Sequence, residues 1–107
     1  MAAISSFDET HIREIAKVLA EAVTHRELTE ILAKCGIEEQ GGNPKWERIL
    51  LALKARQQHD RCGNNVAAFI QAAMDPVRFV GSGPVFSDLR NRLNQILAFS
   101  GLQLVLF

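Results

Sequence analysis

No apolar stretch of the sequence approaches the roughly 20 residues needed to span a membrane. The first ten residues, MAAISSFDET, also lack the basic region and apolar core of a secretory signal. We therefore expect a cytoplasmic protein. Cysteine is scarce too: Cys35 and Cys62 form neither a Cys-x-x-Cys motif nor a Cys/His ligand spacing. Reduced, partly buried thiols are the simplest interpretation, and a structural disulfide or a redox pair is the alternative.

The residue patterns of common catalytic sites are missing as well. His11, His25 and His59 lie on three different predicted elements, and none has a second metal ligand at helical spacing on its own element. The segment Gly81-Ser82-Gly83 lacks the Lys and the Ser or Thr that complete a phosphate-binding loop. From these patterns we expect no enzyme, no cofactor and no metal site.

What the chain does contain fits one globular domain over residues 1–107. Apolar residues make up 48% of the sequence and charged residues 22%, the balance of a folded protein rather than a disordered one. A chain of this length buries roughly two-thirds of its unfolded surface. That is enough for one core without metal or disulfide support.

Five segments carry apolar residues at the spacing of an amphipathic helix, at about 8–23, 24–36, 43–63, 64–75 and 84–101. Asp8 or Ser6 is the candidate cap for the first helix, and Asn43 is the candidate for the third. Thr24 and Glu27 have the spacing of a capping box, and Gly36 stands where a left-handed C-cap is wanted. We predict an all-α fold, a compact orthogonal array of about five helices with a helix-turn-helix or death-like outline.

Two segments fall outside this helical pattern. The loop 77–83 carries three apolar residues, Val77, Phe79 and Val80, which we expect to fold back onto the core. The final residues 102–107 are apolar and β-prone, so a C-terminal strand could follow the last helix. Within this chain such a strand would have no partner strand. Either the chain is cut short, or the strand pairs with a second copy or completes another domain.

Charge is divided between the two parts of the chain although the net charge is zero. Residues 1–40 hold eight acids and four bases, a net −4, and residues 41–107 hold four acids and eight bases, a net +4. One explanation is that an acidic first helix neutralises a basic third helix inside the fold. The other is association with a charge-complementary partner, including another copy of the chain.

The stretch 45–74 contains the only Trp and two helical patterns separated by a polar corner, 56–65. The corner has two interpretations. It could be helix punctuation, with Gly63 as a C-cap, Asn64 or Asn65 as the next N-cap, and Asp60 and Arg61 locking the turn. It could also be a recognition surface, and the face expected to bind a partner then comprises Arg48, Arg56, Gln57, Asp60 and Arg61.

A nucleic-acid interface is the alternative hypothesis, because residues 24–53 read as helix, turn, helix. On the basic face of residues 45–61, the side chains expected to contact phosphates are those of Lys45, Arg48, Lys54 and Arg56. Against this, the connector has six or seven residues rather than the usual three or four, and DNA-binding domains are usually basic overall. A solvated basic face is the simpler interpretation.

The central block resembles the N-terminal region of the bacterial Ymh family. The matching residues are Lys45-Trp46-x-Arg48, Leu53, Ala55-Arg56-Gln57, Asp60-Arg61-Cys62-Gly63-Asn64, and Ala68-Phe69-Ile70-x-Ala72-Ala73-Met74-Asp75-Pro76-Val77-Arg78. The resemblance continues earlier in Leu28, Leu32-x-x-Cys35-Gly36-Ile37 and later in Leu93-Asn94 and Leu97-Ala98-Phe99-Ser100-Gly101-Leu102. It therefore covers most of the chain.

The resemblance implies that this chain is the N-terminal module of a longer protein. Members of the family usually continue into a second helical domain of the HEPN type and are associated with bacterial abortive infection and phage defence. The ribonuclease motif of HEPN proteins, Arg followed by four to six residues and then His, belongs to that second domain and has no counterpart here. We predict a non-catalytic protein-interaction module, an adaptor or sensor, that binds another protein or forms a homodimer.

Overall fold

The computed structural model describes residues 3–104, and this part of the chain is entirely helical apart from its connections. Five α-helices are present: α1 (Glu9–Ala20), α2 (His25–Lys34), α3 (Lys45–Asp60), α4 (Asn64–Ala73) and α5 (Gly83–Leu97). Two short 3-10 helices, η1 (Pro76–Phe79) and η2 (Ala98–Ser100), flank α5. The prediction of an all-α fold of five helices is confirmed.

The expected C-terminal strand is not seen in the part of the chain that can be checked. Residues 102–104 have no regular secondary structure, and residues 105–107 lie outside the described range. The segment 102–104 instead runs back along α5, where Asn94 donates to the Leu104 carbonyl at 3.3 Å and accepts from the Leu104 N–H at 2.7 Å. Leu104 is buried by this contact.

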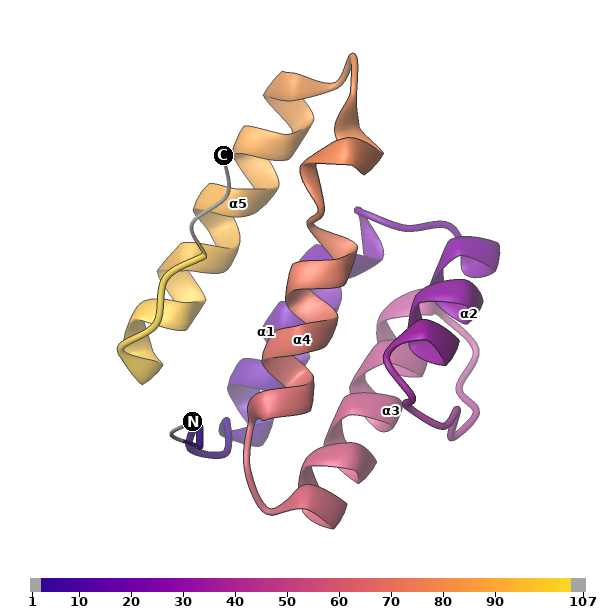
Figure 1. Ribbon diagram of the computed structural model, residues 1–107, viewed down its shortest axis with the longest axis vertical. Helices are drawn as coiled ribbons and strands as arrows, with labels where there is room; N and C mark the ends of the chain where they lie inside the picture. Colours follow the sequence, from indigo (N-terminus) through magenta and orange to yellow (C-terminus); the bar gives the residue numbers. More distant parts are fainter. Residues whose placement is uncertain (1–2, 105–107) are drawn as a thin grey trace.

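Helix α1 organises the packing of the fold (Figure 1). It packs against α3 on one side and α5 on the other, while α4 packs against α2 and α3. All five helices bury apolar side chains in one continuous core, for example Leu19, Leu28, Leu53, Phe69 and Leu93. The Cα radius of gyration is 12.8 Å, close to the roughly 13 Å expected of a compact domain of this size. No helix within residues 3–104 is long and apolar enough to cross a membrane.

The ends of α2 follow the sequence prediction. The Thr24 hydroxyl accepts from the Glu27 N–H at 3.1 Å, and the Glu27 carboxylate accepts from the Thr24 N–H at 2.8 Å. These reciprocal bonds form the predicted capping box. After the helix, Gly36 takes the left-handed conformation at φ +69°, as expected for a C-cap.

Two other predicted caps are wrong. Asp8 occupies the N-cap position of α1, but its side chain makes no capping hydrogen bond. The N-cap of α3 is Pro44, which has no side-chain acceptor, rather than Asn43. Glu47 in the first turn of α3 reaches back instead and accepts from the Asn43 N–H at 3.3 Å, which ties the connector to the start of the helix.

The expectation that Val77 and Val80 fold back onto the core is also wrong. Val77 is 76% exposed and Val80 is 85% exposed. The reason is the 3-10 geometry of η1, in which residues three apart lie on the same face. Phe79 lies on another face and packs edge-on against Phe86, with ring centroids 5.2 Å apart, so Val77 and Val80 share the outer face.

Acids from the first part of the chain pair with bases from the second part inside the fold. Four ion pairs each join an acid from residues 1–40 to a base from residues 41–107: Glu9–Lys54, Glu21–Arg92, Glu27–Arg78 and Glu39–Arg48. The Glu21–Arg92 pair is bidentate, with bonds of 3.0 and 2.6 Å, and joins α5 to the residue after α1. Only Glu9–Lys54 joins α1 to α3 as the internal explanation expects, and the other three pairs join other elements; association with a charged partner stays a prediction.

Candidate functional site

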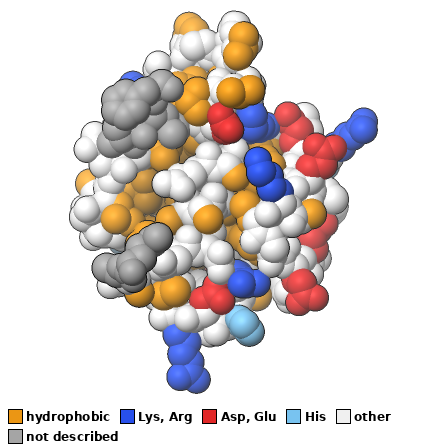
Figure 2. Space-filling view, in the orientation of Figure 1, with side chains coloured by type: hydrophobic (Ala, Val, Ile, Leu, Met, Phe, Trp, Pro, Cys, Tyr) orange, Lys and Arg blue, Asp and Glu red, His pale blue; other side chains and the backbone are white. Residues whose placement is uncertain are grey.

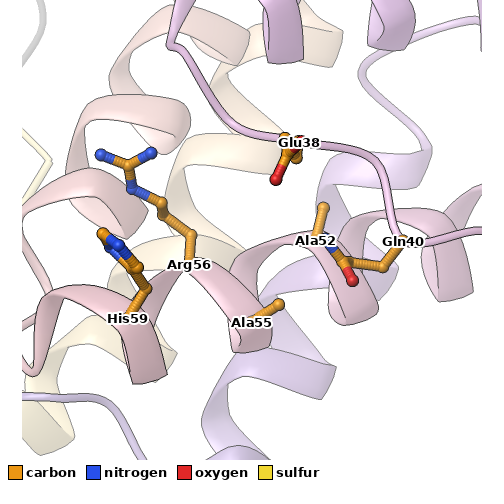
Figure 3. A pocket seen from close by; sticks show the side chains of 6 residues that line it. All are labelled: Glu38, Gln40, Ala52, Ala55, Arg56 and His59. Carbon is orange, nitrogen blue, oxygen red and sulfur yellow. The ribbon is translucent and has the colours of Figure 1, made fainter.

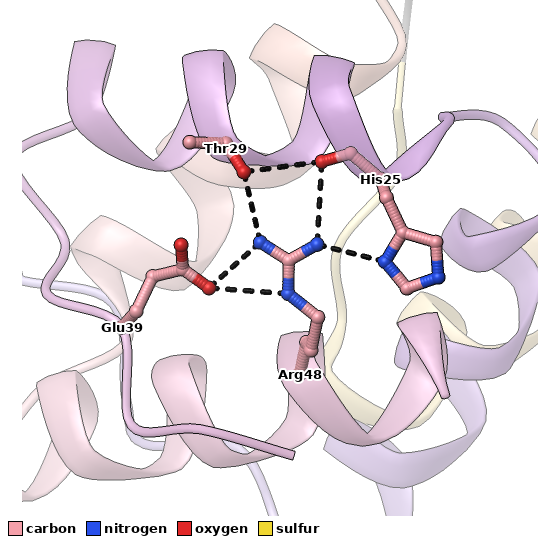
Figure 4. A network of polar contacts seen from close by, with 4 residues as sticks. All are labelled: His25, Thr29, Glu39 and Arg48. Carbon is pink, nitrogen blue, oxygen red and sulfur yellow. Dashed lines mark hydrogen bonds and ion pairs between the residues drawn. The ribbon is translucent and has the colours of Figure 1, made fainter. Parts of the chain in front are cut away.

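Arg48 is the centre of a polar network that joins α3 to α2 (Figure 4). Its guanidinium donates to the Glu39 carboxylate at 2.7 and 3.1 Å and to the Thr29 hydroxyl at 2.9 Å. It also contacts the His25 ring nitrogen Nδ1 at 2.8 Å and donates to the His25 carbonyl at 3.2 Å. The side chain is only 12% exposed. Its donors are occupied within the chain, which makes Arg48 a structural residue.

Arg56 and Asp60 form a second internal network in the last turn of α3, with Asp60 as its final residue. The Arg56 guanidinium donates to the Asp60 carboxylate and to the Gly36 carbonyl, both at 2.9 Å. Asp60 also accepts a hydrogen bond from the Asn65 amide and lies 3.2 Å from His59 Nδ1. The hydrogen bonds from Asn65, Arg56 and His59 lower the pKa of Asp60 to about 2. The carboxylate therefore stays charged at any physiological pH.

A small cavity lies between α3 and the connector that follows α2. Its volume is about 140 Å³, and the side chains around it are those of Glu38, Gln40, Ala52, Ala55, Arg56 and His59. In the close view, Arg56 and His59 project from α3 at one end of the cavity and Gln40 lies at the other (Figure 3). The cavity is smaller than the roughly 300 Å³ at which ligand pockets usually begin. It is the size of a few water molecules.

Gln57 holds the N-terminal segment onto α3. Its side-chain carbonyl accepts from the Phe7 N–H at 2.8 Å, and its amide donates to the Phe7 carbonyl at 2.9 Å. These bonds place the Phe7 ring in the core, where the residue is 4% exposed. Gln57 is therefore occupied by the chain itself.

The corner between α3 and α4 ends one helix and begins the next, but the residues that do so differ from those expected, and its role as a recognition surface stays a prediction. The C-cap of α3 is Arg61, which takes the left-handed conformation at φ 56°, and not Gly63, whose φ is −94°. Gly63 is the N-cap of α4, in place of the expected Asn64 or Asn65. Asp60 locks the corner through Asn65 and Arg56 rather than through Arg61.

The N-terminal segment explains why Gly63 is glycine. The Gly63 N–H donates to the Ile4 carbonyl at 2.7 Å, and the Asn64 side chain accepts from the Ile4 N–H at 2.7 Å. A Cβ at position 63 would lie 2.7 Å from the Ser5 carbonyl oxygen and 2.8 Å from the Phe7 ring. Close approach of the backbone therefore selects glycine here, rather than a positive φ.

The remaining cations of the proposed nucleic-acid face are engaged as well. The Lys45 ammonium donates to the Val23 carbonyl at 2.9 Å, and the Lys54 ammonium pairs with Glu9 at 2.5 Å. With Arg48 and Arg56, all four cations expected to contact phosphates already bind acceptors of this chain. Phosphate contact would have to replace those bonds. Of the residues expected to bind a partner, Arg61 alone has an exposed side chain with no polar partner among residues 3–104.

Sequence reasoning missed exposed apolar side chains on the turn before α5 and in the first turn of α5. Val77, Val80 and Val85 are 76%, 85% and 52% exposed, and we call this group the valine tip. Hydrophobic side chains gather at the corresponding end of the molecule, at the top of the view in Figure 2. The sequence signal was the i, i+3 spacing of Val77 and Val80 after a helix-opening proline, which suits one outward face of a 3-10 turn.

A hollow lies at the other end of α5, between η2 and the N-terminal segment. Its volume is about 490 Å³, and it is lined by Ala3, Ile4, Ser5, Ser6, Asp8, His11, Phe99, Ser100 and Leu102. We call it the Phe99 hollow. The Phe99 ring is 77% exposed and stacks on the His11 ring with centroids 5.2 Å apart. The sequence gives no local signal for it, because its two walls are about ninety residues apart in the chain.

The cysteines agree with the simplest sequence interpretation. Cys35 and Cys62 are both free thiols of intermediate exposure. Partial burial raises the pKa of the Cys35 thiol, and the nearby Lys34 offsets this only in part. A raised pKa disfavours the reactive thiolate.

Neither a family model nor a curated protein nor a solved structure matches this chain significantly. The resemblance to the Ymh family stays a prediction.

Proposed function

We propose that this chain is a non-catalytic protein-interaction module, an adaptor or sensor domain of a bacterial defence-type protein. The defence context comes from the sequence resemblance to the Ymh family. The interaction role is supported by one observation above all, the valine tip. Val80 keeps 85% of its surface exposed, whereas 24 hydrophobic residues between positions 3 and 104 are buried. Exposed apolar groups gathered on one projection are typical of a binding surface.

The valine tip is a better candidate for the contact surface than the polar corner. A residue in a binding surface must be able to leave solvent for a partner without breaking the fold. Arg48, Gln57 and Asp60 do not meet this condition, since each holds together segments of its own chain. Val77 and Val80 meet it, because burying them removes apolar surface from water without breaking any internal hydrogen bond.

Site-specific photo-cross-linking tests this proposal. A photoreactive amino acid at position 80 of the full chain, expressed in its native host, should give a defined protein adduct on irradiation. The matched control places the same amino acid at Gln95, an exposed position on α5 outside both the valine tip and the Phe99 hollow. Equal labelling from positions 80 and 95, or none from either, would show that the tip is not a contact surface.

A further inference from the structure

Residues 102–104 run back along α5 without regular secondary structure, and we call them the leucine segment (Figure 1). Exposure alternates along the segment: Leu102 is half-buried, Gln103 is exposed and Leu104 is buried. An alternation with a period of two is typical of an extended chain, in which successive side chains point to opposite sides. The fold therefore holds an extended segment against one of its helices.

A single side chain of α5 pairs with the backbone of this segment. Asn94 accepts from the Leu104 N–H at 2.7 Å and donates to the Leu104 carbonyl at 3.3 Å. Asparagine is a poor helix former, so the stability of α5 alone does not favour it at this half-buried position. Its two bonds are of the kind that bind an added strand, where main-chain hydrogen bonds give affinity and side-chain pockets give specificity.

An apolar groove continues beside Leu104. Its volume is about 110 Å³, and its lining includes Phe7, Ile70 on α4 and Leu97 on α5. An apolar cavity of about 150 Å³ is enough to hold benzene. Leu104 therefore covers only part of the apolar surface, and the remaining space suits about one more apolar side chain.

The leucine segment is held by fewer polar contacts than the other extended segment of the chain. Residues 4–7 make four hydrogen bonds with α3 and the start of α4. Leu104 makes two, both with Asn94, and the Leu102 N–H closes the preceding turn onto the Leu97 carbonyl at 3.0 Å. Ordering each residue costs backbone entropy comparable to the net gain from a hydrogen bond. The segment can therefore leave α5 while the helices stay folded.

We infer that the surface beside Asn94 binds an extended peptide of a partner protein, and that the leucine segment occupies this site as an internal competitor. The segment shows the chemistry of the ligand. It has a backbone N–H and carbonyl for Asn94, a leucine at the place of Leu104, and a second apolar side chain for the groove. The site is separate from the valine tip, and the inference goes beyond the proposed function without depending on that tip.

Competition by the leucine segment controls the apparent affinity of the site. A ligand binds more weakly in proportion to the fraction of molecules whose site is already filled. A segment tethered next to its site has an effective concentration in the millimolar range. The site is therefore largely closed to a weak peptide until the segment is released.

Peptide binding to the full chain tests the inference. The probe has the sequence of residues 100–104, with an acetylated and amidated backbone so that no terminal charge is added. Leu104→Asp in the chain disfavours the internal competitor and keeps Asn94 and the groove. In two-dimensional NMR, the peptide should shift the Asn94 side-chain amide of this variant, with a Kd of about 1 mM. The unchanged chain should bind at least about 10-fold more weakly.

Two changes to the probe test the chemistry of the ligand. A Leu104→Asp peptide should not bind, because it carries a charge into the apolar place of the leucine. A Leu102→Phe peptide should bind more tightly than the original, because Leu102 also lines the groove and a larger ring fills more of it. Equal binding of the original and the Leu102→Phe peptide would overturn the groove as part of the site.

Variants of the chain test the role of Asn94. Asn94→Ala combined with Leu104→Asp should lower the affinity at least about 10-fold, since two hydrogen bonds are lost. Asn91→Ala in the same background is the matched control, because Asn91 is exposed on α5, and it should leave binding unchanged. Circular dichroism should show the same helix content for all variants. If Leu104→Asp does not fold, Leu104→Gly takes its place.

Three results would overturn the inference. They are no binding to the Leu104→Asp chain at about 10 mM peptide, equal binding to this variant and to the unchanged chain, and equal binding with and without Asn94. Hydrogen exchange of the unchanged chain gives an independent measurement. The Leu104 N–H should exchange at least about 100-fold faster than the buried middle of α3, and equal protection would contradict local release. Cross-links from position 80 depend on none of these results, so the proposed function is tested separately.

Discussion

The side-chain amide of Gln57 satisfies both backbone groups of Phe7, accepting from its N–H at 2.8 Å and donating to its carbonyl at 2.9 Å. The two residues are 50 positions apart. The pairing resembles that of a neighbouring strand, and it leaves neither group of Phe7 unsatisfied. The pairing is partly buried. Together with the bond from the Gly63 N–H to the Ile4 carbonyl, it holds residues 4–7 across the end of α3.

Replacing Gln57 with Ala should destabilise the fold by about 1–3 kcal/mol, since two partly buried backbone groups lose their partner. Urea denaturation followed by circular dichroism measures the change. The neighbouring Gln58 is exposed and serves as the control, and Gln58→Ala should stay within about 0.5 kcal/mol of the unchanged protein. Equal effects of the two substitutions would contradict the role assigned to Gln57.

The local part of this fold could be predicted from the sequence, because its signals are local. The capping box of Thr24 and Glu27 spans four residues, and the left-handed Gly36 follows directly on the helix it ends. The five helices follow from apolar spacing within each segment. Such features need no knowledge of the rest of the chain.

The use of the polar side chains could not be predicted in the same way. Arg48 binds His25 and Thr29, 23 and 19 positions away, and Gln57 binds Phe7, 50 positions away. From the sequence alone, a surface arginine that binds a partner and one that joins two helices look alike. Gly63 shows the same limit, because a helix stop and a close backbone approach select the same residue.

Arg48→Ala should cost about 2–4 kcal/mol of unfolding free energy, because several partners around a 12% exposed guanidinium lose their donor together. Arg48→Lys should recover only part of the loss, since an ammonium cannot reproduce the planar fork. The control is Arg26→Ala on α2, where the side chain is 91% exposed and pairs with Glu30 at 3.6 Å. Its effect should stay within about 1 kcal/mol, as for surface ion pairs. Chemical denaturation distinguishes these outcomes.

Asp60 should make stability depend on acid pH. Its pKa in the fold is about 2, below the ordinary 3.8, so the unfolded chain binds more protons in this interval. The stabilisation is therefore complete above about pH 5 and is lost as the pH falls from about 4 to 2. The difference in unfolding free energy between the unchanged protein and Asp60→Asn should narrow over this interval.

The control for this pH dependence is Asp8→Asn, which removes an 82% exposed carboxylate. Thermal melts between about pH 2 and pH 6 measure both variants against the unchanged protein. A difference for Asp60→Asn that is constant over the interval would mean that Asp60 does not titrate below its ordinary range in the fold.

Gly63→Ala should destabilise the chain although its backbone φ of −94° suits any residue. The added methyl would lie 2.7 Å from the Ser5 carbonyl oxygen and 2.8 Å from the Phe7 ring, so residues 5–7 must move away from the corner. Overpacking of this kind costs about 1–3 kcal/mol. Gly83→Ala is the matched control, because a Cβ there meets nothing within 4 Å at the start of α5. It should be neutral or slightly stabilising, since alanine favours the helix by up to about 1 kcal/mol over glycine.

Hydrogen exchange locates the effect of Gly63→Ala as well as its size. Because the Gly63 N–H bonds to the Ile4 carbonyl and the Ile4 N–H to the Asn64 side chain, displacement of residues 4–7 should break both bonds. Amide protection should therefore fall at Ile4, Phe7 and Gly63, while the middle of α2 keeps its protection relative to global unfolding. A uniform loss of protection would indicate that the N-terminal segment and the helical core unfold as one unit. Full retention at Ile4 would mean that the segment does not depend on close approach to Gly63.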